Sequence, residues 1–121
     1  MKLAIKSFAD PGSIDQERIA ISVLGDVDVG SFAIFRAKRN STGDVSAGYK
    51  VAYWFPDKQV KAGDLVILYT KKGKSREKQL DGDRTAHFFY WGLSDPAWAP
   101  NSGNAAVLLS VAEWKTKDPD A

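Results

Sequence analysis

Apolar and polar side chains alternate along short segments of this chain, and this alternation restricts its fold more than any other feature. In residues 17–24, Ile19, Ile21 and Val23 fall on one side at a period of two, and residues 49–55 repeat the pattern. A period of two belongs to a β-strand, whose successive side chains point to opposite faces; an α-helix has a longer period. The alternation therefore predicts strands.

Further strand segments are more uniformly apolar. Residues 31–37 and 64–70 have the composition of strands covered on both faces, and residues 84–91 and 104–111 continue the series. Clusters of Asp, Asn, Gly, Ser and Pro stand at almost every junction. Short strands at this spacing predict an all-β sandwich of about seven or eight strands in two sheets. A last short strand is expected around Trp114.

Helix has little room in this pattern, because the two best segments, residues 13–20 and 110–117, also fit strands. The 121 residues are expected to form one domain, 1–121, large enough to bury a core without disulfides or metal. The chain has no cysteine, so thiolate metal sites and thiol nucleophiles are excluded.

The N-terminal residues 1–10 contain lysines but no sustained apolar stretch, which predicts a first strand rather than a signal peptide. No run approaches the roughly 18 apolar residues of a membrane-spanning helix. The chain as given is therefore expected to be cytoplasmic, with a secreted or multidomain parent as the alternative. A net charge of +2 is too mild to indicate nucleic acid by itself.

Four motifs follow one another between residues 17 and 110. They read E-R-I-A-I at 17–21, D-V-G-S-F-A-I at 28–34, F-P-D at 55–57 with V-K-A-G-D-L-V-I-L-Y-T at 60–70, and Y-W-G at 90–92 with N-S-G-N-A-A-V-L at 101–108. In this order and spacing they resemble the lamin tail domain, a module of nuclear lamins and many bacterial proteins. The resemblance implies an immunoglobulin-like β-sandwich whose loops or sheet edge bind another protein.

Large aromatic residues accompany these motifs. Each offers on the order of 150–250 Å² of surface to bury, so a position in the core is the simplest interpretation. For Trp98, in the loop at residues 95–103, the alternative is an exposed anchor for a binding partner, since Trp is frequent at binding hot spots. The aromatic residues expected in the core are Phe32, Trp54, Phe55, Trp91 and Trp98.

Turn residues in the same motifs have predictable backbone roles. Gly63 and Gly103 are expected at positive φ, which glycine adopts without steric penalty. Asn101 and Asn104 are expected to close their loop through hydrogen bonds from side chain to backbone.

His87 is the only histidine. On a strand over residues 84–91 it shares a face with Thr85, Phe89 and Trp91, so we expect a half-buried, hydrogen-bonded imidazole. A Ser–His–Asp triad would need an activated serine beside it, and the sequence has no nucleophile elbow. No catalytic residue, cofactor or metal site is predicted, and the protein is not expected to be an enzyme.

Two pairs of carboxylates stand close together in the sequence, Asp26 with Asp28 and Asp81 with Asp83. Carboxylates are ligands that Ca²⁺ prefers, but neither pair lies in a complete twelve-residue calcium loop. Solvated turns are the expected role of both pairs.

Residues 71–78 form the most strongly charged segment, with five cations and one anion. We expect a hairpin between the strands at 64–70 and 84–91, with a basic tip. Such a tip has two possible roles. It discourages pairing between the sheet edges of two molecules, or it binds the phosphates of a nucleic acid independently of the base sequence. Aromatic residues, which would stack on bases, are absent within it. The candidate contacts to an anionic partner are Lys71, Lys72, Lys74, Arg76, Lys78 and Arg84.

Two functions are therefore expected. The first is a non-catalytic interaction module that binds a protein partner of unknown identity through loops or a sheet edge. The alternative is an accessory binder of nucleic acid or an anionic surface that acts through residues 71–78. Self-association through an open sheet edge is a further possibility.

Overall fold

The computed structural model describes residues 1–120, and for residues 45–50 it describes the backbone alone. The all-β prediction is confirmed: within residues 1–120 the helical structure is one 3-10 turn, Val29–Ser31. Eight strands have four or more residues and two have two. The strands are β1 (Leu3–Ala9), β2 (Arg18–Val23), β3 (Val27–Asp28), β4 (Phe32–Arg39), β5 (Val45–Trp54), β6 (Gln59–Val60), β7 (Leu65–Tyr69), β8 (Arg76–Gln79), β9 (Thr85–Tyr90) and β10 (Asn104–Ser110).

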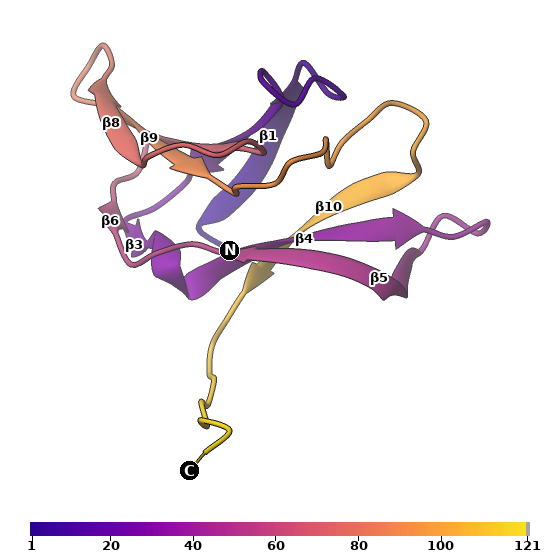
Figure 1. Cartoon of the computed structure of the whole chain (residues 1–121). Helices are drawn as coiled ribbons and strands as arrows, with labels where there is room; N and C mark the ends of the chain where they lie inside the picture. Colours follow the sequence, from indigo (N-terminus) through magenta and orange to yellow (C-terminus); the bar gives the residue numbers. More distant parts are fainter. Residues whose placement is uncertain (121) are drawn as a thin grey trace.

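The strands form two larger sheets and one short ladder. The five-stranded sheet has the order β1-β2-β7-β9-β8, the three-stranded sheet β10-β4-β5, and β3 pairs with β6. Neighbours are antiparallel except β7 and β9, which run parallel. The two larger sheets face each other as layers, with β3 and β6 at one end, and the C-terminal residues extend away from the layer of β4, β5 and β10 (Figure 1).

The core lies between the two larger sheets and follows the alternation of the strands. Ile19 and Ile21 of β2 are fully buried, as is Ile34 of β4 in the opposite sheet. Phe89 of β9 meets the ring of Phe55 edge-on, with centroids 5.3 Å apart. Each such side chain contributes about 1.5–3 kcal/mol by its burial, so these contacts hold the two sheets together.

The aromatic core predictions hold for four of the five residues. Phe32, Phe55 and Trp98 are buried, and Trp91 is partly buried against the core. The prediction for Trp54 is wrong, because its side chain is 48% exposed. Alternation along β5 turns Trp54 to the outer face of its sheet, since its neighbours Tyr53 and Phe55 face inward.

The two segments with the best helical pattern are not helical, and the predicted strand around Trp114 is wrong. No helix forms over residues 13–20, where a turn leads into β2, and none forms over residues 110–117. No strand forms around Trp114, because β10 ends at Ser110. Nowhere in residues 1–120 is a helix long and apolar enough to cross a membrane.

The expected turn conformations are found. Gly63 and Gly103 have φ of 93° and 76°, values at which a Cβ would be strained. The side-chain amide of Asn104 donates to the carbonyl of Ala97 at 2.9 Å, which closes the loop at 97–104. The prediction for Asn101 is wrong in part: among the described residues its side chain makes no hydrogen bond to the backbone, and it shapes the loop through its φ of 63° instead.

A buried carboxylate fastens this loop to the core. Glu17 is fully buried, and its Oε1 accepts the backbone N–H groups of Gly12 at 2.8 Å and Trp98 at 3.0 Å. Its Oε2 accepts the N–H of Ala97 at 2.9 Å and the hydroxyl of Thr70. Four donors satisfy one charge that would otherwise be costly to bury.

Candidate anionic-partner interface

The basic segment has a different path from the predicted one. Residues 71–78 do not form a hairpin between β7 and β9, because these strands are parallel neighbours. The chain leaves β7, crosses at residues 71–75, and returns as β8 on the far side of β9. A hairpin requires antiparallel neighbours, so the prediction is wrong, and the basic residues lie along a sheet edge instead of at a projecting tip.

Alternation along β8 separates its side chains onto two faces. Arg76 pairs with Phe88 and Lys78 with Ala86, so both cations lie on the outer face of the five-stranded sheet. Glu77 lies on the other face, beside a polar cleft. The strand therefore presents its positive charge to the outside.

Three aromatic rings lie on the same outer face. Tyr69 of β7 stacks on Tyr90 of β9, with centroids 5.3 Å apart and planes 14° apart. Tyr69 also stacks on Phe88, at 6.4 Å and 28°. Sequence reasoning missed this group, because the rings come from two strands and only the parallel register of β7 and β9 aligns them. Each stacked pair contributes about 0.5–1.5 kcal/mol beyond its burial.

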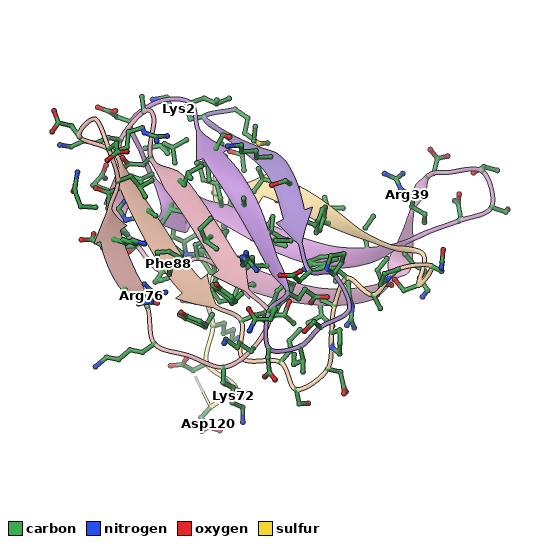
Figure 2. All side chains as sticks on the ribbon, turned by 90° about the horizontal axis from the view of Figure 1, so that it is seen from above. Lys2, Arg39, Lys72, Arg76, Phe88 and Asp120 are labelled. Carbon is green, nitrogen blue, oxygen red and sulfur yellow. The ribbon has the colours of Figure 1, made fainter. Side chains whose placement is uncertain are left out.

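Cationic side chains cover the ends of this stack. The guanidinium carbon of Arg76 lies 4.0 Å from the centroid of Phe88, and the two lie together on the face seen in Figure 2. The ammonium of Lys71 lies 5.3 Å and the guanidinium carbon of Arg18 5.7 Å from the centroid of Tyr69. These contacts are within the range of cation–π attraction. We call this group the aromatic–cation row: Arg18, Tyr69, Lys71, Arg76, Phe88 and Tyr90.

The remaining cationic candidates lie at different distances from the row. Lys72 and Lys74 are exposed in the crossover, and Figure 2 shows Lys72 beyond the end of the sheet. Arg84 lies at the opposite end of β9, where its Nε donates to the carbonyl of Asp81 at 3.2 Å. At about 3.3 Å per residue, the length of β9 separates Arg84 from Tyr90 by roughly 20 Å. The structure therefore does not bring Arg84 into the row.

Searches of known protein families and of curated proteins find no match to this chain. Function is therefore inferred from the residues themselves.

Trp98 does not form the exposed anchor proposed as its alternative role. Its side chain is 6% exposed and packs against Phe8 and Trp91, with centroids 5.5 Å and 6.1 Å away. The backbone bond to Glu17 holds it inward. The surrounding loop lines a shallow cleft of about 290 Å³ together with Phe8 and Pro11.

His87 is more deeply buried than predicted and has an ionic partner that the sequence did not reveal. It is 4% exposed, and its Nε2 lies 2.9 Å from Oδ2 of Asp64. Asp64 also accepts the backbone N–H groups of Lys61 at 3.1 Å and Thr85 at 2.9 Å. Burial acts to raise the pKa of Asp64, but the bonds from His87, Thr85 and Lys61 outweigh it and hold this pKa below its ordinary value.

The first pair of loop carboxylates fastens the short β3–β6 ladder. Asp26 accepts the N–H of Ala62 at 2.9 Å, and Asp28 accepts those of Gly30 at 2.8 Å and Lys58 at 2.9 Å. Both side chains are thus occupied by the backbone. Among the described residues, no three His, Cys, Asp or Glu side chains are grouped so that they could hold a metal ion.

An apolar patch lies on the outer face of the three-stranded sheet. Trp114 is 55% exposed and meets Trp54 edge-on, with centroids 5.0 Å apart. Trp54 donates its indole N–H to the carbonyl of Gly30 at 2.7 Å. The two indoles border an apolar cleft of about 230 Å³, also lined by Ala33, Phe35, Ala52 and Val111.

Proposed function

We propose that this protein is a non-catalytic binding module that contacts single-stranded nucleic acid through the aromatic–cation row. The supporting observation is the position of Arg76 against Phe88 on the outer face of the five-stranded sheet, next to the stacked Tyr69 and Tyr90. The row crosses four strands, from β2 to β8. At about 4.8 Å between strands, it extends over roughly 14 Å, enough to contact more than one nucleotide.

The chemistry of the row suits a flexible polyanion. Arginine and lysine neutralise phosphates, and aromatic side chains are the usual neighbours of unpaired bases. The rings stack on one another and remain partly exposed, so they hold Arg76 and Lys71 in place before a ligand arrives. Cations that are already positioned lose less side-chain entropy on binding.

The resemblance of residues 17–110 to the lamin tail domain supports binding, rather than catalysis, as the kind of function. The partner that it implies is another protein, held by the loops or a sheet edge, so the assignment to nucleic acid rests on the row alone. Function on a protein scaffold depends on its surface residues, and the row joins three cations to three aromatic rings on one face of the part of the chain that the structure describes.

The experiment is a titration of a labelled oligo-dT strand, followed by fluorescence anisotropy at about 50 mM and about 200 mM salt. The double variant Lys71→Gln with Arg76→Gln should bind at least about tenfold more weakly. Its salt slope should be smaller by about 1.4, because two phosphate contacts are removed.

Arg84→Gln is the matched control, since it removes one cation at the far end of β9. It should bind like the natural protein. The proposal fails if the natural protein does not bind at the lower salt concentration. It also fails if Arg84→Gln loses as much affinity as the double variant.

A protein contact at the apolar patch is the second candidate function, favoured by the exposure of Trp54 and Trp114. Contiguous exposed apolar surface is typical of contact sites. The patch lies on a sheet whose terminal strands are β10 and β5, so a second copy of this chain is the partner that we propose. Sedimentation velocity over a range of concentrations tests it, and a monomer throughout would exclude it.

A further inference from the structure

The inward side of β8 carries a second arrangement, directly behind the cations of the row. Glu77 points from β8 toward His87 of β9, its partner in the strand register. Oε1 of Glu77 lies 3.5 Å from Nδ1 of His87. This Nδ1 is buried and has no hydrogen-bond partner among the described residues. A buried nitrogen without a partner is uncommon and calls for a physical explanation.

The contacts of the other ring nitrogen, Nε2, determine whether Nδ1 of His87 can donate a hydrogen bond or only accept one. Nε2 faces Asp64, whose carboxylate already accepts two backbone N–H groups and has a lowered pKa. An ionised Asp64 needs a donor, so Nε2 carries a hydrogen. In a neutral imidazole, Nδ1 then carries a lone pair and can only accept a hydrogen bond. It faces the carboxylate of Glu77, which also only accepts, so the two groups repel each other. A proton on Nδ1 turns the same contact into a charge-assisted hydrogen bond.

Among the charged groups that the structure describes around His87, Glu77 is the one that faces Nδ1. Lys58 forms an ion pair with Oε1 of Glu77, which lowers the pKa of Glu77 and keeps it ionised. Asp64 holds Nε2, as described. Lys61 and Asp83 line the polar cleft of about 440 Å³ beside it.

The contact between Glu77 and His87 would hold β8, which is a short, exposed strand at the edge of its sheet. All four residues of β8 are exposed, and β8 is the last strand of its sheet. Short edge strands open more easily than central ones, because few contacts hold them. Arg76 and Lys78 are fixed on the outer face only while β8 stays paired with β9.

We propose that protonation of His87 locks β8 onto the sheet through Glu77, and that this lock strengthens binding of nucleic acid at the aromatic–cation row. With His87 protonated, Nδ1–H donates to Glu77 and β8 holds Arg76 and Lys78 in place. With His87 neutral, the two acceptors oppose each other and β8 opens more often. The effect on binding rests on the proposed function, whereas the effect on β8 does not.

The first measurement uses the protein alone. Backbone protection factors of β8 from hydrogen exchange, corrected for the intrinsic rate, are compared at about pH 5.5 and about pH 8, the range in which imidazole ordinarily changes charge. We expect about tenfold higher protection at the lower pH, as for one added hydrogen bond to a charged group. Nitrogen-15 shifts of the His87 ring, recorded at both pH values, should show a proton on Nδ1 wherever β8 is the more protected.

Glu77→Gln is the decisive variant. A glutamine can donate its amide to a bare Nδ1 and accept from a protonated one, so β8 should stay protected at both pH values. Lys58→Gln removes the ion pair of Glu77 but leaves the contact with His87, so it should keep the pH step. The lock is overturned if β8 of the natural protein is equally protected at both pH values. It is also overturned if Glu77→Gln keeps the full step.

Oligo-dT titrations at the two pH values complete the test. We expect at least about fivefold tighter binding at the lower pH, and no such gain in Glu77→Gln, which keeps His87. A gain that persists in Glu77→Gln would be a simple effect of charge and would overturn the link to β8. If β8 shows its pH step but oligo-dT never binds, the proposed function fails while the lock on β8 stands.

Discussion

The backbone N–H of Trp98 donates to the carboxylate of Glu17 at 3.0 Å, joining two residues 81 positions apart. The same carboxylate accepts from Gly12, Ala97 and the hydroxyl of Thr70. One buried side chain therefore holds two loops against the end of β7.

Replacement of Glu17 should destabilise the protein strongly. Glu17→Ala leaves three backbone N–H groups without an acceptor, so the free energy of unfolding should fall by about 3–5 kcal/mol. Urea unfolding followed by circular dichroism measures this loss. Asp15→Ala, at an exposed position two residues away, should change it by less than about 0.5 kcal/mol. Equal stability of the two variants would contradict the role given to Glu17.

Addition of one methyl group at Gly73 should disturb the aromatic–cation row. A Cβ at this position would lie 2.4 Å from Cδ2 of Tyr90, so the ring has to move off Tyr69. Gly73→Ala should therefore lower stability by about 1–3 kcal/mol and weaken binding of oligo-dT. Ser75→Ala, in the same crossover, is the control and should change neither. Unchanged stability and binding of Gly73→Ala would argue against the packing described for the crossover.

Replacement of Trp54 by Phe should destabilise the protein more than the same replacement of Trp114. Trp54→Phe removes the donor to the carbonyl of the buried residue Gly30 and should lower the free energy of unfolding by about 1–2 kcal/mol. Trp114→Phe keeps an aromatic ring against Trp54 and should cost less than about 0.5 kcal/mol. Thermal unfolding of the two variants measures the difference. A larger loss for Trp114→Phe would be inconsistent with these contacts.

Asp64 should make the free energy of unfolding depend on pH in the acid range. Because the folded-state pKa of Asp64 lies below its ordinary value of 3.8, its contribution is complete above that pH. The contribution is lost as the pH falls through the lower, folded-state pKa. Asp64→Asn should lower stability by about 1–3 kcal/mol near neutral pH and reduce its fall below about pH 4. Urea unfolding at several pH values measures both effects, and an identical fall in the variant would contradict the assignment.

The strands could be predicted from the sequence because alternation is local. Ile19 and Ile21 face the core as their spacing requires, and Trp54 departs from the expected core set because it alternates with Tyr53 and Phe55. The path of residues 71–78 could not be predicted, since local turn signals do not reveal that β7 and β9 are parallel neighbours.

The candidate site was predicted only in part, for the same reason. Lys71 and Arg76 were visible as charges, but Tyr69 and Phe88 are brought to them by register between strands distant in the sequence. The partner of His87 also lies across the fold, in Asp64, 23 positions earlier. A glutamate before a run of alternating aliphatic residues was the one local sign of the buried Glu17.

The sheet order β1-β2-β7-β9-β8 has a consequence for the protein as it is made on the ribosome. After β1 has paired with β2, the other edge of β2 stays unpaired until residues 65–69 have been translated. The free edge of β7 then stays unpaired until residues 85–90 have been translated. The nascent chain thus exposes an unfinished β-edge while later strands emerge, a period in which chaperones or slow codons at these points would influence the yield of folded protein.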